Sequence, residues 1–280
     1  MRTAPTPLAD ARTFLFVPGN RPERFDKAVK SGADAVVFDL EDAVPPAEKE
    51  SARASIDDAW PALRNAGVPL VIRINTPAEP QGREDLRWLA RLEAPAGIMV
   101  PKADSGAMLG AVLSSAPGAA ILPLIESAAA YGSLADIAAA QGVLRLVVGH
   151  IDFQADTGMG CSEDQAELAP LRFAVSVATR CHGLAPAVDG VTVSIDDDDA
   201  LRRDTRRALR FGFGGKLCIH PRQVAVVHQA MQPGHDELAW ARRVLEADAA
   251  SAGAAVRLDG KMVDAPVVLQ ARRTLARAGR

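Results

Sequence analysis

The sequence is poor in cysteine, which argues against a disulfide-rich or zinc-clustered protein. Its 280 residues include three cysteines, Cys161, Cys181 and Cys218. They are an odd number and lack the close spacing of a disulfide framework or a zinc cluster. We therefore expect three reduced thiols, which are typical of a cytosolic protein.

The sequence also lacks an excess of positive charge and a long apolar run. Its formal net charge is −3 and its pI is about 6.0, so the basic field of a nucleic-acid-binding protein is missing. No run approaches the roughly 18 apolar residues of a membrane span, and residues 1–10 contain no apolar signal segment. We expect a soluble, cytoplasmic protein with no nucleic-acid partner and no membrane partner.

What the sequence does contain is a regular alternation of short apolar runs with segments of helical period. The eight runs are residues 13–17, 35–40, 70–74, 97–100, 120–125, 144–148, 184–193 (with interruptions) and 215–219. Glycines at 32, 67, 142 and 183 stand where the intervening helices should end. Alternating strands and helices predict an α/β fold with a parallel sheet, and eight repeats favour a closed (β/α)₈ TIM barrel over an open doubly wound sheet.

The alternation ends near residue 233. Residues 236–250 and 266–278 are predicted to form two helices around a Gly260-Lys261 turn, without an accompanying strand. We expect one domain over residues 1–280, with the barrel at about 13–232 and a C-terminal helical extension at about 233–280.

Two of the apolar runs stop on a carboxylate. One runs from Ile121 to Glu126 and the other from Leu144 to Asp152, with one helix-length segment between them. An acid that follows a buried parallel strand lies at the rim of the sheet, where ligands bind. Hard oxygen ligands from successive strands suit Mg²⁺, which takes one or two carboxylates and keeps positions for water and substrate.

Polar side chains follow nearly every predicted strand at this same rim. They are Asn20, Arg21, Asp39, Glu41, Asp42, Arg73, Asn75, Lys102, Glu126, His150, Asp152, Asp189, Ser194 and His220. Structural alternatives exist: an aspartate at a strand end commonly caps the next helix, and a lysine such as Lys102 can simply be solvated. Likewise, the acidic run 196–199 precedes an arginine-rich segment, which favours helix capping over a metal cluster.

Arg73 is different because it is a permanent cation inside the apolar run Val71-Ile72-Arg73-Ile74. A buried cation needs a carboxylate or phosphate partner. That partner is either protein, such as Asp39 or Glu41 on the adjacent strand, or an anionic substrate.

Seven short motifs follow one another along the chain. They are FVPGN at 16–20, DLEDAV at 39–44, VIRIN at 71–75, VPKADS at 100–105, IES at 125–127, DF at 152–153 and GFGGKLCIHP at 212–221, with LDGKMVDAP at 258–266 after them. Together they resemble the citrate lyase β-subunit-like (CitE-like) family, in the HpcH/HpaI aldolase group of phosphoenolpyruvate/pyruvate barrels.

The resemblance implies a Mg²⁺-dependent lyase that makes or breaks a carbon–carbon bond in a small 3-hydroxyacyl-CoA of the citryl-, malyl- or citramalyl-CoA type. It also implies a homo-oligomer, a trimer or a hexamer. By position, Glu126 and Asp152 would bind Mg²⁺ and Arg73 would hold the substrate carboxylate. Glu41 and Asp42, the other catalytic candidates, would lie with Asp39 around metal-bound water. The predicted substrate-binding residues are Arg73, Asn20, Arg21, Lys102, Asp39 and His150.

Two positions depart from the family pattern. His150-Ile151-Asp152 stands where many members have Gly-Glu-Asp, and Ser194 stands where many have an aspartate that is a candidate acid/base. Other functions therefore remain open: an aldolase on a free hydroxy-oxo-acid, a malyl-CoA-type thioesterase, or a non-catalytic metabolite-binding barrel or lyase-complex subunit.

Overall fold

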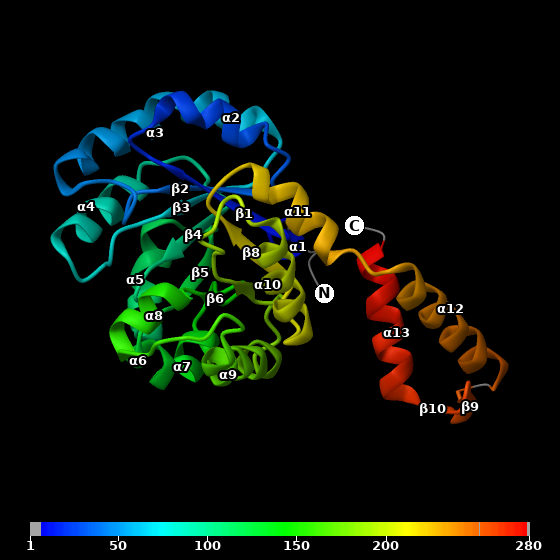
Figure 1. Ribbon diagram of the computed structural model, residues 1–280. Coiled ribbons are helices and arrows are strands. Elements are labelled where there is room, and N and C mark those ends of the chain that lie inside the picture. Colours follow the sequence, from blue (N-terminus) through cyan, green and yellow to red (C-terminus); the bar gives the residue numbers. More distant parts are fainter. Residues whose placement is uncertain (1–6, 252, 279–280) are drawn as a thin grey trace. The chain divides into compact units, whose positions relative to one another are not determined.

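The computed structural model describes residues 7–251 and 253–278. By its internal contacts the chain divides into two compact units, Met1–Val227 and His228–Arg280. The first is a closed barrel of eight parallel strands in sequence order, with helices between the strands (Figure 1). The predicted (β/α)₈ barrel is therefore confirmed.

The barrel strands run from β1 to β8, and β1 pairs with β8 to close the ring. Their bounds are β1 Thr13–Pro18, β2 Ala35–Asp39, β3 Leu70–Arg73, β4 Gly97–Val100, β5 Ala120–Ile125, β6 Val147–Val148, β7 Val188–Asp189 and β8 Gly215–Cys218. β6 and β7 are shorter than predicted. Pro186 has no N–H to donate, and the segment before β6 meets β5 through a single bridge between Ile121 and Val143.

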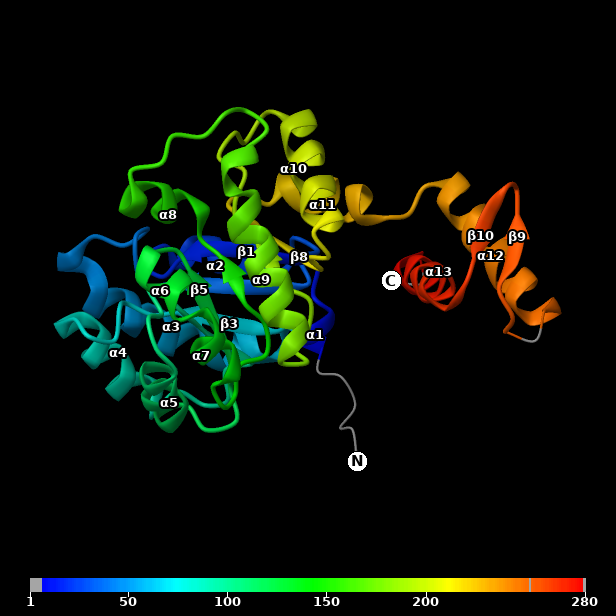
Figure 2. The same cartoon turned by 90° about the horizontal axis from the view of Figure 1, so that it is seen from below.

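Helices surround the strands, and α2, α3, α4, α5, α7 and α9 contact one another in turn around the barrel (Figure 2). The helices of this unit are α1 Pro7–Asp10, α2 Phe25–Val29, α3 Lys49–Leu63, α4 Pro80–Leu89, α5 Gly106–Ser115, α6 Ala128–Gly132, α7 Leu134–Ala139, α8 His150–Thr157, α9 Ala169–Cys181, α10 Asp198–Arg210 and α11 Arg222–Met231, whose last four residues belong to the second unit. Short 3-10 turns lie at Pro22–Arg24 (η1), Pro46–Glu48 (η2), Arg64–Ala66 (η3) and Ala166–Leu168 (η4). No helix among the described residues has the length and apolarity needed to cross a membrane.

The barrel interior is apolar over most of its height, and a buried arginine closes its N-terminal end. Phe14, Val37, Val71 and Leu122 belong to one cluster of buried side chains inside the ring. Arg145 is fully buried and donates to the carbonyls of Leu8, Ala11 and Pro186. Because these contacts fill the N-terminal end, the opposite mouth of the barrel is the end available for a site.

The second unit contains α12 His235–Ala250 and α13 Ala265–Ala278, as predicted, but also a two-stranded sheet. β9 Val256–Leu258 and β10 Lys261–Val263 pair antiparallel across Asp259-Gly260. Both turn residues have positive φ, 49° and 78°. Asp-Gly between short apolar runs is a recognised hairpin signal, so the prediction of helices without a strand was wrong here.

Candidate active site

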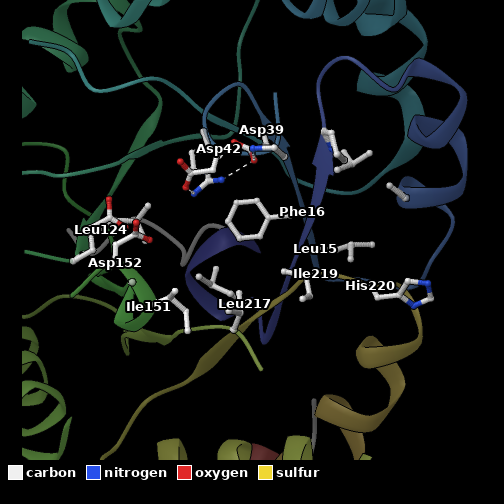
Figure 3. A pocket seen from close by; sticks show the side chains of 18 of the residues that line it. Leu15, Phe16, Asp39, Asp42, Leu124, Ile151, Asp152, Leu217, Ile219 and His220 are labelled. Atoms are coloured by element: carbon white, nitrogen blue, oxygen red, sulfur yellow. Dashed lines mark hydrogen bonds and ion pairs between the residues drawn. The ribbon is translucent and has the colours of Figure 1, made fainter. Parts of the chain in front are cut away.

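A cavity of about 720 Å³ lies at the C-terminal mouth of the barrel (Figure 3). Its charged lining at one end includes Asp39, Asp42, Arg73, Glu126 and Asp152. Figure 3 shows Asp39, Asp42 and Asp152 on one side of Phe16, and Leu15, Ile219 and His220 on the other. The cavity thus has a charged end and a largely apolar end.

Arg73 ends β3 at the charged end and is held by carboxylates of the neighbouring strand. Its Nε and Nη2 donate to the two oxygens of Asp39 at 2.7 and 2.6 Å, and its Nη1 lies 2.9 Å from Glu41 Oε2. Burial alone would lower the pKa of Arg73. The neighbouring acids outweigh burial and raise this pKa above its ordinary value. The predicted protein partner therefore exists, and Arg73 also lines the cavity.

The acidic segment after β2 is fixed by its own first residue. The carboxylate of Asp39 accepts hydrogen bonds from the backbone N–H of Glu41 (2.9 Å) and Ala43 (3.3 Å). Asp42 remains exposed at the rim, 3.5 Å from Arg73 Nη1. Burial, with the nearby charges of Glu126, Asp42 and Asp39 and against that of Arg73, raises the pKa of Glu41 to about 8.

Glu126 directly follows β5 and is buried, with 3% of its surface exposed. Its Oε1 accepts the backbone N–H of Lys102 at 2.7 Å, and Lys102 adopts a positive φ of 47°. Burial and the charge of Asp152 raise the pKa of Glu126 to about 7, although the Lys102 hydrogen bond opposes this. A strained backbone that aims an amide at a buried acid is typical of a functional site.

Asp152 lies in the first turn of α8, so its predicted position at the end of a strand was wrong. The chain turns into the helix at Gly149, immediately after β6. A Cβ at Gly149 would lie 2.3 Å from Glu126 Oε2, so the close approach of these two segments requires glycine. The N-cap of the helix is Gly149, which has no side chain to cap it, and Asp152 lines the cavity.

This donor set suits Mg²⁺. Within the described part of the chain, no group of three or more His, Cys, Asp or Glu side chains is arranged to hold a metal. Mg²⁺ needs fewer, because it binds through one or two carboxylates and retains several waters. The negative charge of buried Glu126 is unfavourable, and a second carboxylate, Asp152, lines the same cavity. A divalent cation bound between them would stabilise both negative charges.

We expect Mg²⁺ affinity to depend on pH through Glu126. Because the pKa of this carboxyl is raised to about 7, Mg²⁺ must displace a proton below that pH. The dissociation constant should be about tenfold lower at pH 8 than at pH 6, as one displaced proton requires. Titration calorimetry with Mg²⁺ at the two pH values measures this. Equal affinity at both would contradict it, and Glu126→Gln should remove the dependence along with most of the binding.

Several predicted site residues lie outside the cavity lining. Asn20 donates to Glu48 (2.6 Å), and Arg21 pairs with Glu23 (2.6 Å). The side chain of Lys102 is half exposed, with Nζ 3.6 Å from Glu41 Oε1. Glu41 likewise reaches the site through Arg73 and is not part of the cavity wall.

His150 lines the cavity but is buried, and its ring packs against a glycine. A Cβ at Gly190 would lie 2.1 Å from His150 Nδ1, which has no hydrogen-bond partner. Burial lowers the pKa of His150 to about 4, so the ring is neutral near pH 7.

Asp189, at the end of β7, is buried, with 1% of its surface exposed, and it pairs with Arg172 at 3.0 Å. The prediction that Asp189 lies at the rim was therefore wrong.

The acidic run 196–199 caps a helix, as predicted. Asp197 accepts the N–H of Ala200 at 2.8 Å, and Arg202 pairs with Asp198 and Asp199. His220 accepts the backbone N–H of Arg222 through Nδ1 at 3.2 Å, a contact that orders the turn before α11. Ser194 is exposed and is not among the cavity-lining residues.

Sequence reasoning missed two cations at the cavity. Arg24 in η1 and Lys27 in α2 are exposed side chains that line it. The available signal was their three-residue spacing on a helical segment directly after the β1 turn, which places both on one face.

The C-terminal mouth of this barrel holds two carboxylates and an arginine fixed by ion pairs. This arrangement is typical of an enzyme that binds small anionic substrates with a divalent metal. The chain matches the family model HpcH/HpaI aldolase/citrate lyase over residues 12–221, and it belongs to that family. A second model, C-C bond lyase of the TIM-barrel fold, matches residues 176–279. Membership makes the protein a carbon–carbon lyase.

Individual relatives agree with this assignment. The citrate lyase subunit beta-like protein of Mycobacterium tuberculosis is 38% identical over 277 residues, 95% of each chain. The (3S)-malyl-CoA thioesterase of Cereibacter sphaeroides is 32% identical over 271 residues, 95% of this chain and 94% of that protein. The crystal structure of CitE from M. tuberculosis in complex with magnesium, acetoacetate and coenzyme A has a TM-score of 0.84 at 36% identity, covering 97% of this chain and 100% of that chain.

Proposed function

We propose that this protein is a Mg²⁺-dependent lyase that cleaves the carbon–carbon bond of a small 3-hydroxyacyl-CoA of the citryl-, malyl- or citramalyl-CoA type. The observation that carries the proposal is the meeting of Glu126, Asp152 and Arg73 in one cavity at the barrel mouth. The magnesium and coenzyme A of the similar CitE complex, and the malyl-CoA named for the thioesterase relative, support this substrate class.

Arg73, Glu126 and Asp152 would have separate roles in a retro-Claisen cleavage. In that reaction the 3-hydroxyl loses its proton, its oxygen becomes a carbonyl, and the electron pair of the broken bond passes to the thioester as an enolate, which is then protonated. Arg73, clamped by Asp39, binds the substrate carboxylate and fixes its orientation. Glu126 and Asp152 would hold Mg²⁺, which supplies Lewis-acid stabilisation of the developing negative charge.

The apolar end of the cavity and its two rim cations suit the coenzyme. Ile219, an exposed apolar side chain of the lining, offers surface to a pantetheine arm, and Arg24 and Lys27 offer positive charge to phosphates. His150 lines the cavity and keeps its proposed role near the substrate, whereas Asn20, Arg21 and Lys102 lie outside the lining and stay proposed contacts only for the part of the coenzyme that extends beyond it.

We expect Arg24→Ala with Lys27→Ala to weaken CoA binding. Both side chains are exposed, so each phosphate contact is worth roughly 1 kcal/mol or less and the double variant should bind about tenfold more weakly. The loss should shrink at high salt, because exposed charges are screened. Calorimetric titration with free CoA measures it. Lys30→Ala is the matched control: it is a nearby exposed lysine paired with Asp26. Equal affinity in the double variant and the control would contradict the assignment.

A panel of citryl-, malyl-, citramalyl- and related CoA esters tests the proposed reaction. Cleavage should release a shorter acyl-CoA and an oxo-acid, with Mg²⁺ and not after chelation. No turnover of any ester would overturn the proposal.

The thioesterase relative makes hydrolysis of a malyl-type CoA ester the second candidate. The products separate the two, because hydrolysis releases free CoA thiol and no oxo-acid. A thiol reagent and an oxo-acid assay on the same reaction distinguish them.

The assembly and domain predictions remain proposals. The match to residues 176–279 spans the division near residue 228, which supports treating the C-terminal unit as an extension of one domain. We also propose a homo-oligomer, a trimer or hexamer, as the family resemblance implies. Sedimentation of the purified protein would decide the number of subunits.

A further inference from the structure

Lys49, the first residue of α3, lies behind the acidic segment and is not used by the chemistry above. It is 93% buried (7% exposed), which is rare for lysine without strong partners. Its ammonium group donates to the carbonyl oxygens of Leu40 and Glu41, both at 2.7 Å, and to Asn75 Oδ1 at 2.6 Å. All three donors of the ammonium are therefore satisfied.

The partners of Lys49 lie on the two strand ends that build the charged end of the cavity. Leu40 and Glu41 follow β2, directly after Asp39, and Asn75 follows β3, two residues after Arg73. Asp39 holds the same segment from the inside, through the N–H groups of Glu41 and Ala43. The segment is thus fixed by its carbonyls on one side and its amides on the other.

A second buried group braces Asn75. Asp85 on α4 is fully buried, and its Oδ2 accepts both the backbone N–H and the side-chain amide of Asn75 at 2.7 Å. Its Oδ1 accepts Arg53 Nη1 at 2.7 Å, and Arg53 lies one turn after Lys49 on α3. The network returns to the helix on which it began, so α3 and α4 act as a rigid support for both strand ends.

Resting on the proposed function, we propose that Lys49 is a positioning residue that sets the orientation of the Arg73 guanidinium. It does so by fixing the backbone that carries Asp39, Glu41 and Asp42, the acids that clamp Arg73. Asn75 and Asp85 hold Lys49 in turn. Without this support Arg73 would keep its charge but lose its fixed direction, and substrate orientation would be lost with it.

Lys49→Met tests the role, because methionine keeps most of the apolar stem and removes all three donors. We expect kcat/KM for the best CoA ester to fall about 100-fold, as displacement of a positioned group by about 1 Å can cause. Affinity for free CoA should stay unchanged, because the rim cations lie on η1 and α2. A general loss of structure would weaken both. Lys30→Met is the control. It makes the same substitution at an exposed lysine that pairs with Asp26, and it should match the parent protein.

Two further measurements keep the result decisive. If Lys49→Met does not fold, Asp85→Asn should give the same selective loss in smaller degree, because one oxygen of Asp85 becomes an NH2 group, which cannot accept the bond from Arg53 or those from Asn75. Crystal structures carry the test even if the parent protein cleaves no ester, an outcome that would refute only the proposed function. An Arg73 still 2.6 Å from Asp39 and an unmoved segment 40–42 in Lys49→Met would overturn the inference, as would unchanged kcat/KM in an active enzyme.

Discussion

Replacement of Glu126 by Gln, or of Asp152 by Asn, should lower Mg²⁺-dependent kcat/KM by about 1000-fold. Each change keeps the shape of the side chain and removes one anionic ligand of the proposed ion. Lewis-acid stabilisation is worth several kcal/mol, and about 4 kcal/mol corresponds to this factor. Steady-state cleavage of the best CoA ester over a range of Mg²⁺ concentrations measures the effect.

The same variants separate a lost ligand from a lost fold. Burial raises the pKa of Glu126 from 4.5 to about 7, so the folded state loses free energy relative to the unfolded state as pH rises from 4.5 to about 7, and the full cost is present at pH 8. Glu126→Gln removes that cost, and without Mg²⁺ its thermal midpoint at pH 8 should equal or exceed that of the parent. Glu163→Gln is a control, since Glu163 is an exposed acid paired with Arg203. Unchanged turnover in both site variants would refute the metal assignment.

Replacement of Arg73 should have the second large effect, on activity and stability together. Arg73→Met leaves Asp39 and Glu41 buried without their cation, and breaking a buried pair costs about 3–5 kcal/mol. Loss of the carboxylate clamp should also lower kcat/KM by about 1000-fold, which corresponds to about 4 kcal/mol. Chemical denaturation and ester cleavage report the two effects separately.

Arg73→Lys distinguishes the role of Arg73 in stability from its role in orienting the substrate. Lysine restores a positive charge beside the acids but cannot make the paired bonds from Nε and Nη2. We expect most of the stability to return while activity stays low. Recovery of both in Arg73→Lys would show that only the charge of this residue matters, contrary to the proposed orienting role.

Much of this architecture could be predicted because the signals are local. Eight apolar runs with intervening helical periods define the barrel, and residues that end parallel strands meet at one mouth by topology alone. That rule brought Asp39, Arg73 and Glu126 together from positions far apart in the sequence. It located Asp152 only roughly, because Gly149 turns the chain into α8 before the acid is reached.

The remaining features depend on three-dimensional contacts that local sequence patterns do not indicate. Asp189 has the same strand-end pattern as Asp39, yet it is buried and pairs with Arg172 on α9, while its neighbour Val188 belongs to the cluster inside the ring. Arg24 and Lys27 looked like ordinary helix-surface charges until the cavity was seen beside them. The Lys49 network joins residues from two helices and two strand ends, so no spacing rule reveals it. The hairpin β9–β10, by contrast, was readable from Asp259-Gly260 and was missed.

A crystal structure with Mn²⁺ in place of Mg²⁺ and a small oxo-acid such as pyruvate tests the site most directly, because anomalous scattering locates the ion. The expected result is one ion bound by Glu126 and Asp152, with the oxo-acid carboxylate at the guanidinium of Arg73. An ion held elsewhere on the chain, or an oxo-acid bound away from Arg73, would contradict the proposed active site.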